Sequence, residues 1–159
     1  MIIISHRGNI NGVDIYENNP YKILEKAALL PDFHFEVDIW NHNGKYFLGH
    51  NGPLFDFDEK LLSIAPRLWF HCKNLDALRS IAKEKSKKWR WCKFFFHNQD
   101  YCAPVLIKNP ENNIYFTYWV YPNLDCKSDG VIVHLDGPLH KKYNWMGVCT
   151  DNPVQWRNL

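Results

Sequence analysis

Histidines and carboxylates in this sequence stand at the ends of short apolar segments. His6 ends the first such segment, Glu36 and Asp38 interrupt a second one, and His50 follows a third. Because side chains two residues apart in a strand share a face, Glu36 and Asp38 are predicted to lie side by side. Two carboxylates on one apolar face repel and desolvate each other unless positive charge lies between them. That charge can be a divalent cation, or it can be an Arg or Lys side chain.

Other polar groups occupy similar positions further along the chain. His71 and Lys73 share a face of one predicted strand, and His97 stands at the end of the next. His134 and Asp136 share a face near the end of a later strand. Barrel and open-sheet enzymes place their sites at the carboxyl ends of strands. His97 and the His134/Asp136 pair are therefore candidates for pocket lining only.

Apolar runs between turn residues predict strands that must position these groups. A short hairpin strand, Lys45–Leu48, follows Asn43-Gly44. The main predicted strands are Ile2–His6, Phe33–Ile39, Leu68–Cys72, Trp91–His97, Val105–Ile107, Ile114–Val120, Val131–Leu135 and Trp145–Cys149.

Helical patterns are fewer and lie mainly in the first half of the chain. Helices are predicted over Pro20–Leu30, Phe57–Ile64 and Leu75–Lys85. Strands that alternate with helices predict a parallel sheet. A regular (β/α)8 barrel needs about 250 residues, whereas this chain has 159. We therefore predict one α/β domain over residues 1–159, which is either a compact (β/α)8 TIM-type barrel with several outer helices missing or reduced, or a smaller open α/β sheet.

The composition narrows the classes of partner and the compartment. A formal net charge of +2 argues against a nucleic-acid partner, which calls for a basic stripe. No apolar run approaches a membrane span, and the first residues do not form a signal peptide, so we expect no stable membrane insertion. The five cysteines are odd in number and lack C-x-x-C spacing, which favours free thiols in the cytoplasm. Missing outer helices would leave apolar strand faces that a homodimer could cover.

The polar residues also form a recognisable series. His6-Arg7-Gly8, Glu17-Asn18, Glu36-Val37-Asp38 and Gly49-His50 resemble the signature of the glycerophosphodiester phosphodiesterase family, within the phospholipase-C-like phosphodiesterase superfamily. The order and spacing match over roughly residues 1–53, and the segment 147–153 resembles the closing strand of that family. The middle of the chain matches weakly.

Two positions depart from the pattern of this family. Asn51 stands where the family usually has Asp after the second histidine. His71 stands two residues before Lys73, where the family has a Glu that acts as the third carboxylate ligand. An imidazole in that place would move the metal preference from Mg²⁺ or Ca²⁺ toward Mn²⁺ or Zn²⁺. Alternatively, His71 does not bind a metal.

The resemblance implies a role for each matched residue. Glu36 and Asp38 would hold one divalent cation, most simply Mg²⁺ or Ca²⁺, with His71 as an uncertain third ligand. His6 and His50 would act as the base and acid pair, since the imidazole pKa lies near neutrality. The remaining residues have phosphate-binding or supporting roles: Arg7 and Lys73 for the phosphate, and Glu17 in support of the site.

The expected activity is metal-dependent cleavage of a small phosphodiester, such as a glycerophosphodiester, by His acid/base catalysis. Attack by a neighbouring hydroxyl of the substrate would give a cyclic phosphate, which is either hydrolysed or released by a lyase. Asn51, His71 and the missing helices leave a second hypothesis open. In that hypothesis, the chain is a catalytically decayed barrel that binds a phosphorylated ligand.

Overall fold

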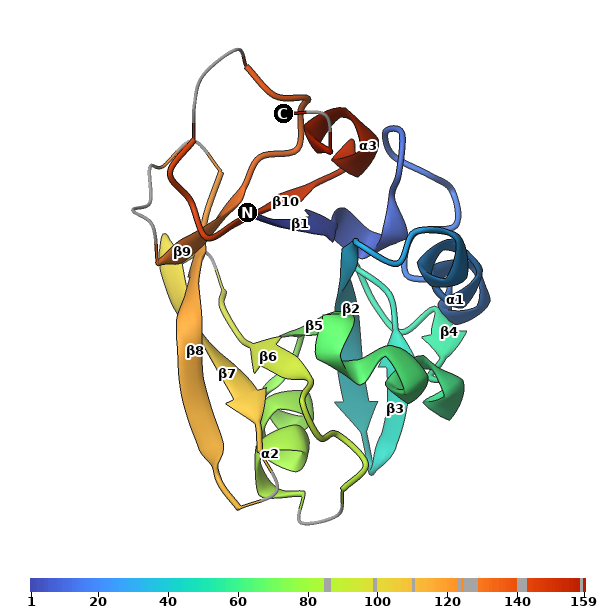
Figure 1. Ribbon diagram of the computed structural model, residues 1–159. Helices are drawn as coiled ribbons and strands as arrows, with labels where there is room; N and C mark the ends of the chain where they lie inside the picture. Colours follow the sequence, from blue (N-terminus) through green and yellow to red (C-terminus); the bar gives the residue numbers. More distant parts are fainter. Residues whose placement is uncertain are drawn as a thin grey trace.

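The strands of the computed structural model close into a barrel (Figure 1). The structure describes residues 1–84, 87–98, 100–109, 111–122, 124, 129–139, 143–157 and 159. Ten strands form one sheet; β3 (Lys45–Leu48) and β4 (Phe55–Asp56) extend from β2, and the other eight form the barrel. Pairing of β1 with both β10 and β2 closes the barrel, so the open-sheet alternative is wrong. In order around the barrel, its strands are β1 (Ile2–Ser5), β2 (His34–His42), β5 (Leu68–Cys72), β6 (Lys93–Phe95), β7 (Cys102–Lys108), β8 (Asn113–Val120), β9 (Gly130–Val133) and β10 (Gly147–Thr150).

One barrel strand runs against its neighbours. β7 pairs antiparallel with β6 and β8, whereas the other neighbours around the barrel pair in parallel. Antiparallel strands need only a short turn between them, but parallel strands need a crossover of a dozen or more residues. A closed α/β barrel with few helices is thus confirmed, but this strand order departs from the regular all-parallel (β/α)8 repeat.

The helices lie outside the barrel, and the two longest α-helices begin where the sequence predicts. α1 (Pro20–Leu29) is capped by the Asn19 side chain, which accepts from the backbone of Tyr21 and Lys22. α2 (Leu75–Lys83) is capped by Asn74; Lys85, at the end of the predicted helix, lies outside the described residues. The remaining helices are short or 3₁₀: η1 (His6–Gly8), η2 (Glu59–Arg67) in place of the predicted Phe57–Ile64, and α3 (Pro153–Trp156).

The apolar side chains pack in an inner and an outer layer because successive strand residues face opposite sides. The inner cluster fills the barrel, with Trp69, Phe95 and Trp119 as its largest members. The outer cluster lies under the helices and includes Phe35, Val37, Phe70 and Phe94 from β2, β5 and β6, with others from α1, η2 and α2. A third cluster joins Ile132 and Val148 to Trp156 of α3. The barrel interior is therefore mainly a packed apolar core, which leaves its ends for clusters of polar groups.

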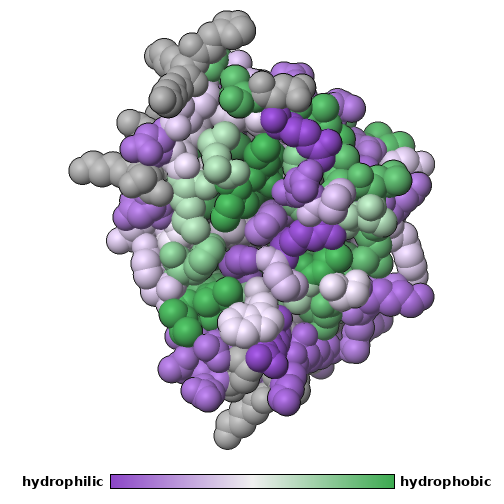
Figure 2. Space-filling view, in the orientation of Figure 1, coloured by the Kyte–Doolittle hydropathy of each residue, from purple (hydrophilic) through white to green (hydrophobic). Residues whose placement is uncertain are grey.

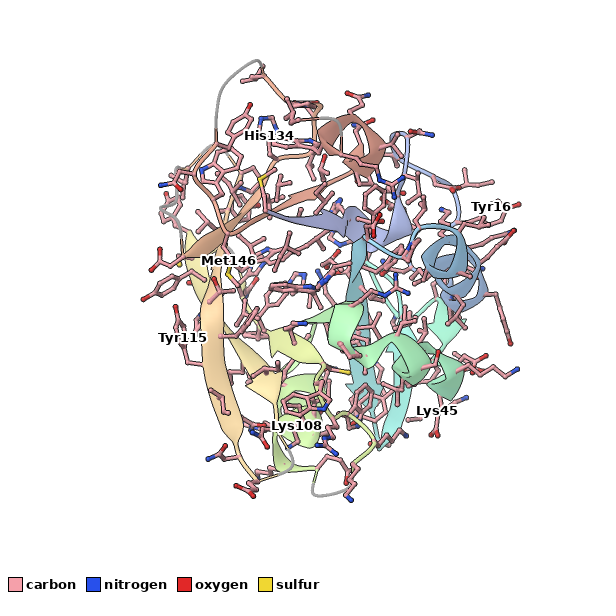
Figure 3. The ribbon with its side chains drawn as sticks, viewed as in Figure 1. Tyr16, Lys45, Lys108, Tyr115, His134 and Met146 are labelled. Carbon is pink, nitrogen blue, oxygen red and sulfur yellow. The ribbon has the colours of Figure 1, made fainter. Side chains whose placement is uncertain are left out.

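The outer surface of β7 and β8 differs from that of the other strands. α2 contacts these two strands at one end, where Lys108 and Asn113 donate to the Ala82 carbonyl, whereas, among the described residues, Figure 1 shows no helix over the rest of their outer face on the left. Their outer face exposes Cys102, Tyr115 and Tyr118, and Figure 3 shows Tyr115 at this edge of the molecule. Hydrophobic areas interrupt the hydrophilic surface in Figure 2. The homodimer suggested by the missing helices stays a prediction.

Two further predictions concern the cysteines and the membrane. The four cysteines that the structure describes, Cys72, Cys92, Cys102 and Cys149, are free thiols, and Cys126 lies outside the described residues. In the described parts of the chain, no helix has the length and apolar character to cross a membrane.

Candidate functional site

The predicted site residues converge at one end of the barrel. The parallel register pairs Asp38 of β2 with His71 of β5, and Ile4 of β1 with His34 of β2. The carboxyl ends of these strands therefore lie together, with His6 immediately after β1. Short distances between side chains, given below, connect all eight residues that the sequence singles out: His6, Arg7, Glu17, Glu36, Asp38, His50, His71 and Lys73.

Asp38 is the centre of this network and is fully buried. Its Oδ2 accepts hydrogen bonds from Asn18 Nδ2 at 3.0 Å and from the His50 ring at 3.1 Å, and it lies 3.3 Å from Arg7 Nε. Its Oδ1 lies 3.4 Å from Lys73 Nζ. Burial alone would raise the pKa of this carboxyl, but its histidine and lysine neighbours hold the pKa well below the usual value. Asp38 is therefore ionised at neutral pH.

Glu36 is equally buried but has less positive charge around it. Its Oε2 accepts a hydrogen bond from the backbone N–H of Arg7 at 3.1 Å, and its Oε1 lies 3.8 Å from His71 Nδ1. Burial and the neighbouring charge of Asp38 raise the pKa of Glu36. The sequence left open whether a cation or basic side chains separate the two carboxylates. In the structure Arg7 and Lys73 reach Asp38, which leaves Glu36 as the less compensated partner.

The arrangement of Glu36, Asp38 and His71 fits a divalent cation. One ligand atom of each residue lies within 4.8 Å of the others. Asp38 Oδ1 is buried and makes no hydrogen bond, although it lies 3.0 Å from His71 Nδ1. An unbonded, buried carboxylate oxygen beside a second carboxylate and an imidazole is a donor set suited to Mg²⁺, Mn²⁺ or Zn²⁺. The residues present therefore fit the cation that the sequence predicts.

His6 is held by a residue to which sequence reasoning gave no role. Its Nδ1 lies 2.8 Å from Asp151 Oδ1, just beyond the end of β10. Burial lowers the pKa of His6, but the hydrogen bond to Asp151 and the charge of Glu36 outweigh it, so the net pKa is raised. Because Asp151 accepts the Nδ1 proton, Nε2 is the ring nitrogen left for other chemistry. The Thr150-Asp151 turn after the last strand was the available signal.

Arg7 has a strained backbone conformation, and both its backbone N–H and its guanidinium contact other residues of the site. Its φ of 52° is in the left-handed region, which non-glycine residues rarely occupy. Its guanidinium donates from Nη1 to Glu17 at 3.4 Å and from Nη2 to the His50 ring at 3.2 Å. Gly8 follows with φ 82°, and a Cβ there would lie 2.9 Å from Ile23 of α1. Gly8 thus permits both the turn and the close approach of α1.

His50 has a partner at each ring nitrogen. Arg7 can only donate, so His50 Nε2 accepts from it, and the proton is on Nδ1, which donates to Asp38. Gly49 makes this position possible because a Cβ there would lie 2.2 Å from the carbonyl oxygen of Gly52. Asn51, the position that departs from the family pattern, is exposed. Asp38 therefore orients the Nδ1 side of His50.

Glu17 belongs to a second acidic group beside the first. Glu17, His6 and Asp151 also place ligand atoms within 4.8 Å of one another. Here Asn9 Nδ2 donates to Glu17 Oε1 and to Asp151 Oδ1, each at 2.7 Å. The amide group already satisfies both carboxylates, so this group is an internal hydrogen-bond network that supports His6 and Arg7. Asn9 is a further residue that sequence reasoning missed.

The remaining histidines divide between the two sides of the barrel wall. The His97 ring stacks on His71 with centroids 4.3 Å apart, which places it beside the site as predicted. His134 instead contacts the ring of Trp156 in α3, and Figure 3 shows it near that helix. The prediction that His134 and Asp136 line the pocket is not supported by these contacts. His34 accepts from Trp69 Nε1 in the interior, and burial lowers its pKa to about 4.

We compared the chain with protein-family models, with curated protein sequences and with solved structures, and none of the three comparisons gave a match. What the site can do therefore follows from its geometry and chemistry.

Proposed function

We propose that this protein is a metal-dependent phosphodiesterase, similar to the glycerophosphodiester phosphodiesterases, on a divergent TIM-type barrel. The observation that carries the proposal is the cluster of charged and imidazole groups around Asp38, which consists of Glu36, His6, His50, His71, Arg7 and Lys73. A phosphodiester needs charge neutralisation, a base for the nucleophile and an acid for the leaving alcohol. These groups supply each of the three.

The cation would be held by Glu36, Asp38 and His71. When bound, it supplies charge for a phosphoryl oxygen and lowers the pKa of an attacking hydroxyl or water. A carboxylate pair with one imidazole suits Mn²⁺ or Zn²⁺ better than a set made only of carboxylates, for which Mg²⁺ and Ca²⁺ are the usual ions. One divalent cation is therefore proposed for this site, and cleavage with each ion in turn identifies it.

His6 is assigned as the general base. Its Nδ1 proton is held by Asp151 at 2.8 Å, so Nε2 presents a lone pair that can accept a proton from the nucleophile. The negative charge of Asp151 then stabilises the imidazolium that forms. Arg7 and Lys73 provide a planar fork and a point charge for the phosphate oxygens.

His50 is assigned as the general acid, and this role requires a rearrangement. Its Nε2 accepts from Arg7 Nη2 at 3.2 Å in the absence of substrate. A bound phosphate would compete for the guanidinium, since a charge-assisted bond to phosphate is stronger than one to a neutral imidazole. His50 Nε2 would then be free to take up a proton from solvent and give it to the leaving oxygen, while Asp38 keeps hold of Nδ1.

The same contacts favour a second candidate function, binding without turnover. Arg7 and Lys73 already lie 3.3 and 3.4 Å from Asp38 oxygens, and both His50 nitrogens are engaged. A barrel that only binds a phosphorylated ligand would keep the basic groups and have no need of the free His6 Nε2. Turnover separates the two functions.

The test is cleavage of bis(p-nitrophenyl) phosphate and of glycerophosphodiesters with Mg²⁺, Ca²⁺, Mn²⁺ and Zn²⁺ in turn. We expect cation-dependent cleavage that falls by more than about a hundredfold in the double variant His6→Ala/His50→Ala, given the usual contribution of acid/base groups. The control is His42→Ala, an exposed histidine that is the last residue of β2 and pairs with Lys45 of β3. Full activity in the double variant would contradict the assigned roles. Phosphate binding without turnover would favour the second function.

Phosphorus NMR of the products distinguishes hydrolysis from a lyase reaction. A hydrolase gives a phosphomonoester as its final product, whereas a lyase releases a cyclic phosphate that persists. The substrate for this measurement must carry a hydroxyl next to the phosphate, because only such a substrate can cyclise.

A further inference from the structure

The end of the barrel that holds the candidate site is divided into a polar and an aromatic half. His6, Asp38, Lys73 and Asp151, from or just beyond β1, β2, β5 and β10, make up the polar half. The adjoining half is formed where β6 and β8 end and β7, the reversed strand, begins. This side carries tyrosines and a histidine, and Asp100 lies near that histidine.

A continuous series of ring contacts connects the two halves. His71 Nδ1 lies 3.0 Å from Asp38 Oδ1, and the His71 ring stacks on His97 with centroids 4.3 Å apart. The rings of His97 and Tyr121 are nearly perpendicular, and their centroids lie 6.0 Å apart. Phe95 and Trp119 stack beneath them at 4.4 Å and hold this wall from the barrel interior.

Strand alternation fixes which side of β8 carries Tyr121. Trp119 is buried in the inner cluster, so Tyr121, two residues later, continues the inner face beyond the strand end. The Tyr121 N–H donates to the Tyr101 carbonyl at 3.0 Å, which places the start of β7 beside it. Tyr121 is 44% exposed and Tyr101 is 75% exposed. These two tyrosines are thus rings at the rim, next to the site and open to a ligand.

We infer that the aromatic half of this mouth binds one alcohol group of the diester and that Tyr121 selects for an aromatic ring there. This inference rests on the proposed function and narrows its substrate class to diesters with an aryl or nucleoside alcohol. Lys73 Nζ lies 3.4 Å from Asp38 Oδ1, and the His71 ring, whose Nδ1 lies 3.0 Å from the same oxygen, stacks on His97, so a phosphate at Lys73 is next to the aromatic half. A flat ring can stack on that wall, whereas a glycerol group would leave the exposed tyrosine faces uncovered.

The test is binding of two phosphate monoesters, phenyl phosphate and glycerol 3-phosphate, by titration calorimetry with Mn²⁺ present. The phosphate is common to both ligands, so the ratio of their dissociation constants reports on the alcohol group alone. We expect the protein to bind phenyl phosphate about tenfold more tightly, the size of one aromatic stacking contact. Tyr121→Leu should remove this preference and leave the affinity for glycerol 3-phosphate unchanged.

The matched control is Tyr118→Leu, because Tyr118 lies on the same strand with a similar exposure of 42% but on the outer face. It should keep the tenfold preference. Equal affinity of the unsubstituted protein for both ligands would overturn the inference, as would an equal loss in both variants. Failure of binding by both ligands would overturn it together with the phosphate site. Ring preference without cleavage of any diester would instead contradict the proposed phosphodiesterase activity and leave the aromatic subsite standing.

Discussion

Replacing Asp151 with Asn should lower the pKa of His6 by about one unit. The two side chains are joined at 2.8 Å, with exposed fractions of 12% for His6 and 9% for Asp151. A hydrogen bond to a charged partner contributes roughly 1.5–3 kcal/mol and a neutral one roughly 0.5–1.5 kcal/mol. The difference of about 1–1.5 kcal/mol corresponds to about one pKa unit. Asp151→Asn keeps the shape and removes the charge.

The assay is the proton NMR titration of the His6 ring, assigned by its disappearance in His6→Gln. Because the lost charge favoured the protonated ring, the titration midpoint should move to lower pH. In an active enzyme, the acid limb of kcat/KM, where the base becomes protonated, should move in the same direction. Asp56→Asn, an exposed residue paired with Lys45, is the control and should leave the midpoint unchanged. An unchanged or raised midpoint in Asp151→Asn would refute the proposed coupling.

Three further outcomes are expected. Burial lowers the pKa of His34 to about 4, so the free energy of unfolding is highest above pH 6.5 and falls as the pH drops toward 4. His34→Gln should remove about 2–3 kcal/mol of this pH dependence in urea unfolding. An equal pH dependence in both proteins would count against this role of His34. Gly8→Ala should lower the free energy of unfolding by about 1–3 kcal/mol more than Gly12→Ala does in the same assay. Both glycines have positive φ, but only a Cβ at Gly8 would contact a neighbouring side chain. Equal losses of unfolding free energy in the two variants would exclude the packing effect. His71→Glu should shift the preferred cation from Mn²⁺ or Zn²⁺ toward Mg²⁺ or Ca²⁺ in calorimetry, and an unchanged order of affinities would remove His71 from the ligand set.

Alternation within strands was sufficient to predict much of the site. Glu36 and Asp38 share a face of β2, and His71 of β5 shares a face with Lys73 just beyond that strand, because apolar neighbours fix the other face in both strands. Closure of the barrel then brings these faces together. The number of strands and the shortness of the chain left a barrel and an open sheet as alternatives, and the family resemblance implied the barrel.

The structure differs from the sequence prediction where a local pattern lacks the needed information. Alternation carries no strand direction, so the reversal of β7 was not foreseen. Both faces of β9 are apolar, so the alternation of side chains could not show that Val133 faces inward and His134 faces outward. Asp151 and Asn9 act through contacts across the chain, more than 140 residues apart. Such pairings depend on tertiary structure and leave no periodic signal.

Cation binding tests the central claim most directly, since the account places one divalent ion between Glu36, Asp38 and His71. The measurement is titration calorimetry of the full chain with Mn²⁺, compared with Glu36→Gln and with Glu25→Gln, an exposed acid on α1. We predict one Mn²⁺ per chain, an affinity at least tenfold weaker in Glu36→Gln, and no change in Glu25→Gln. No binding to the unsubstituted protein, or equal binding to all three, would contradict the account.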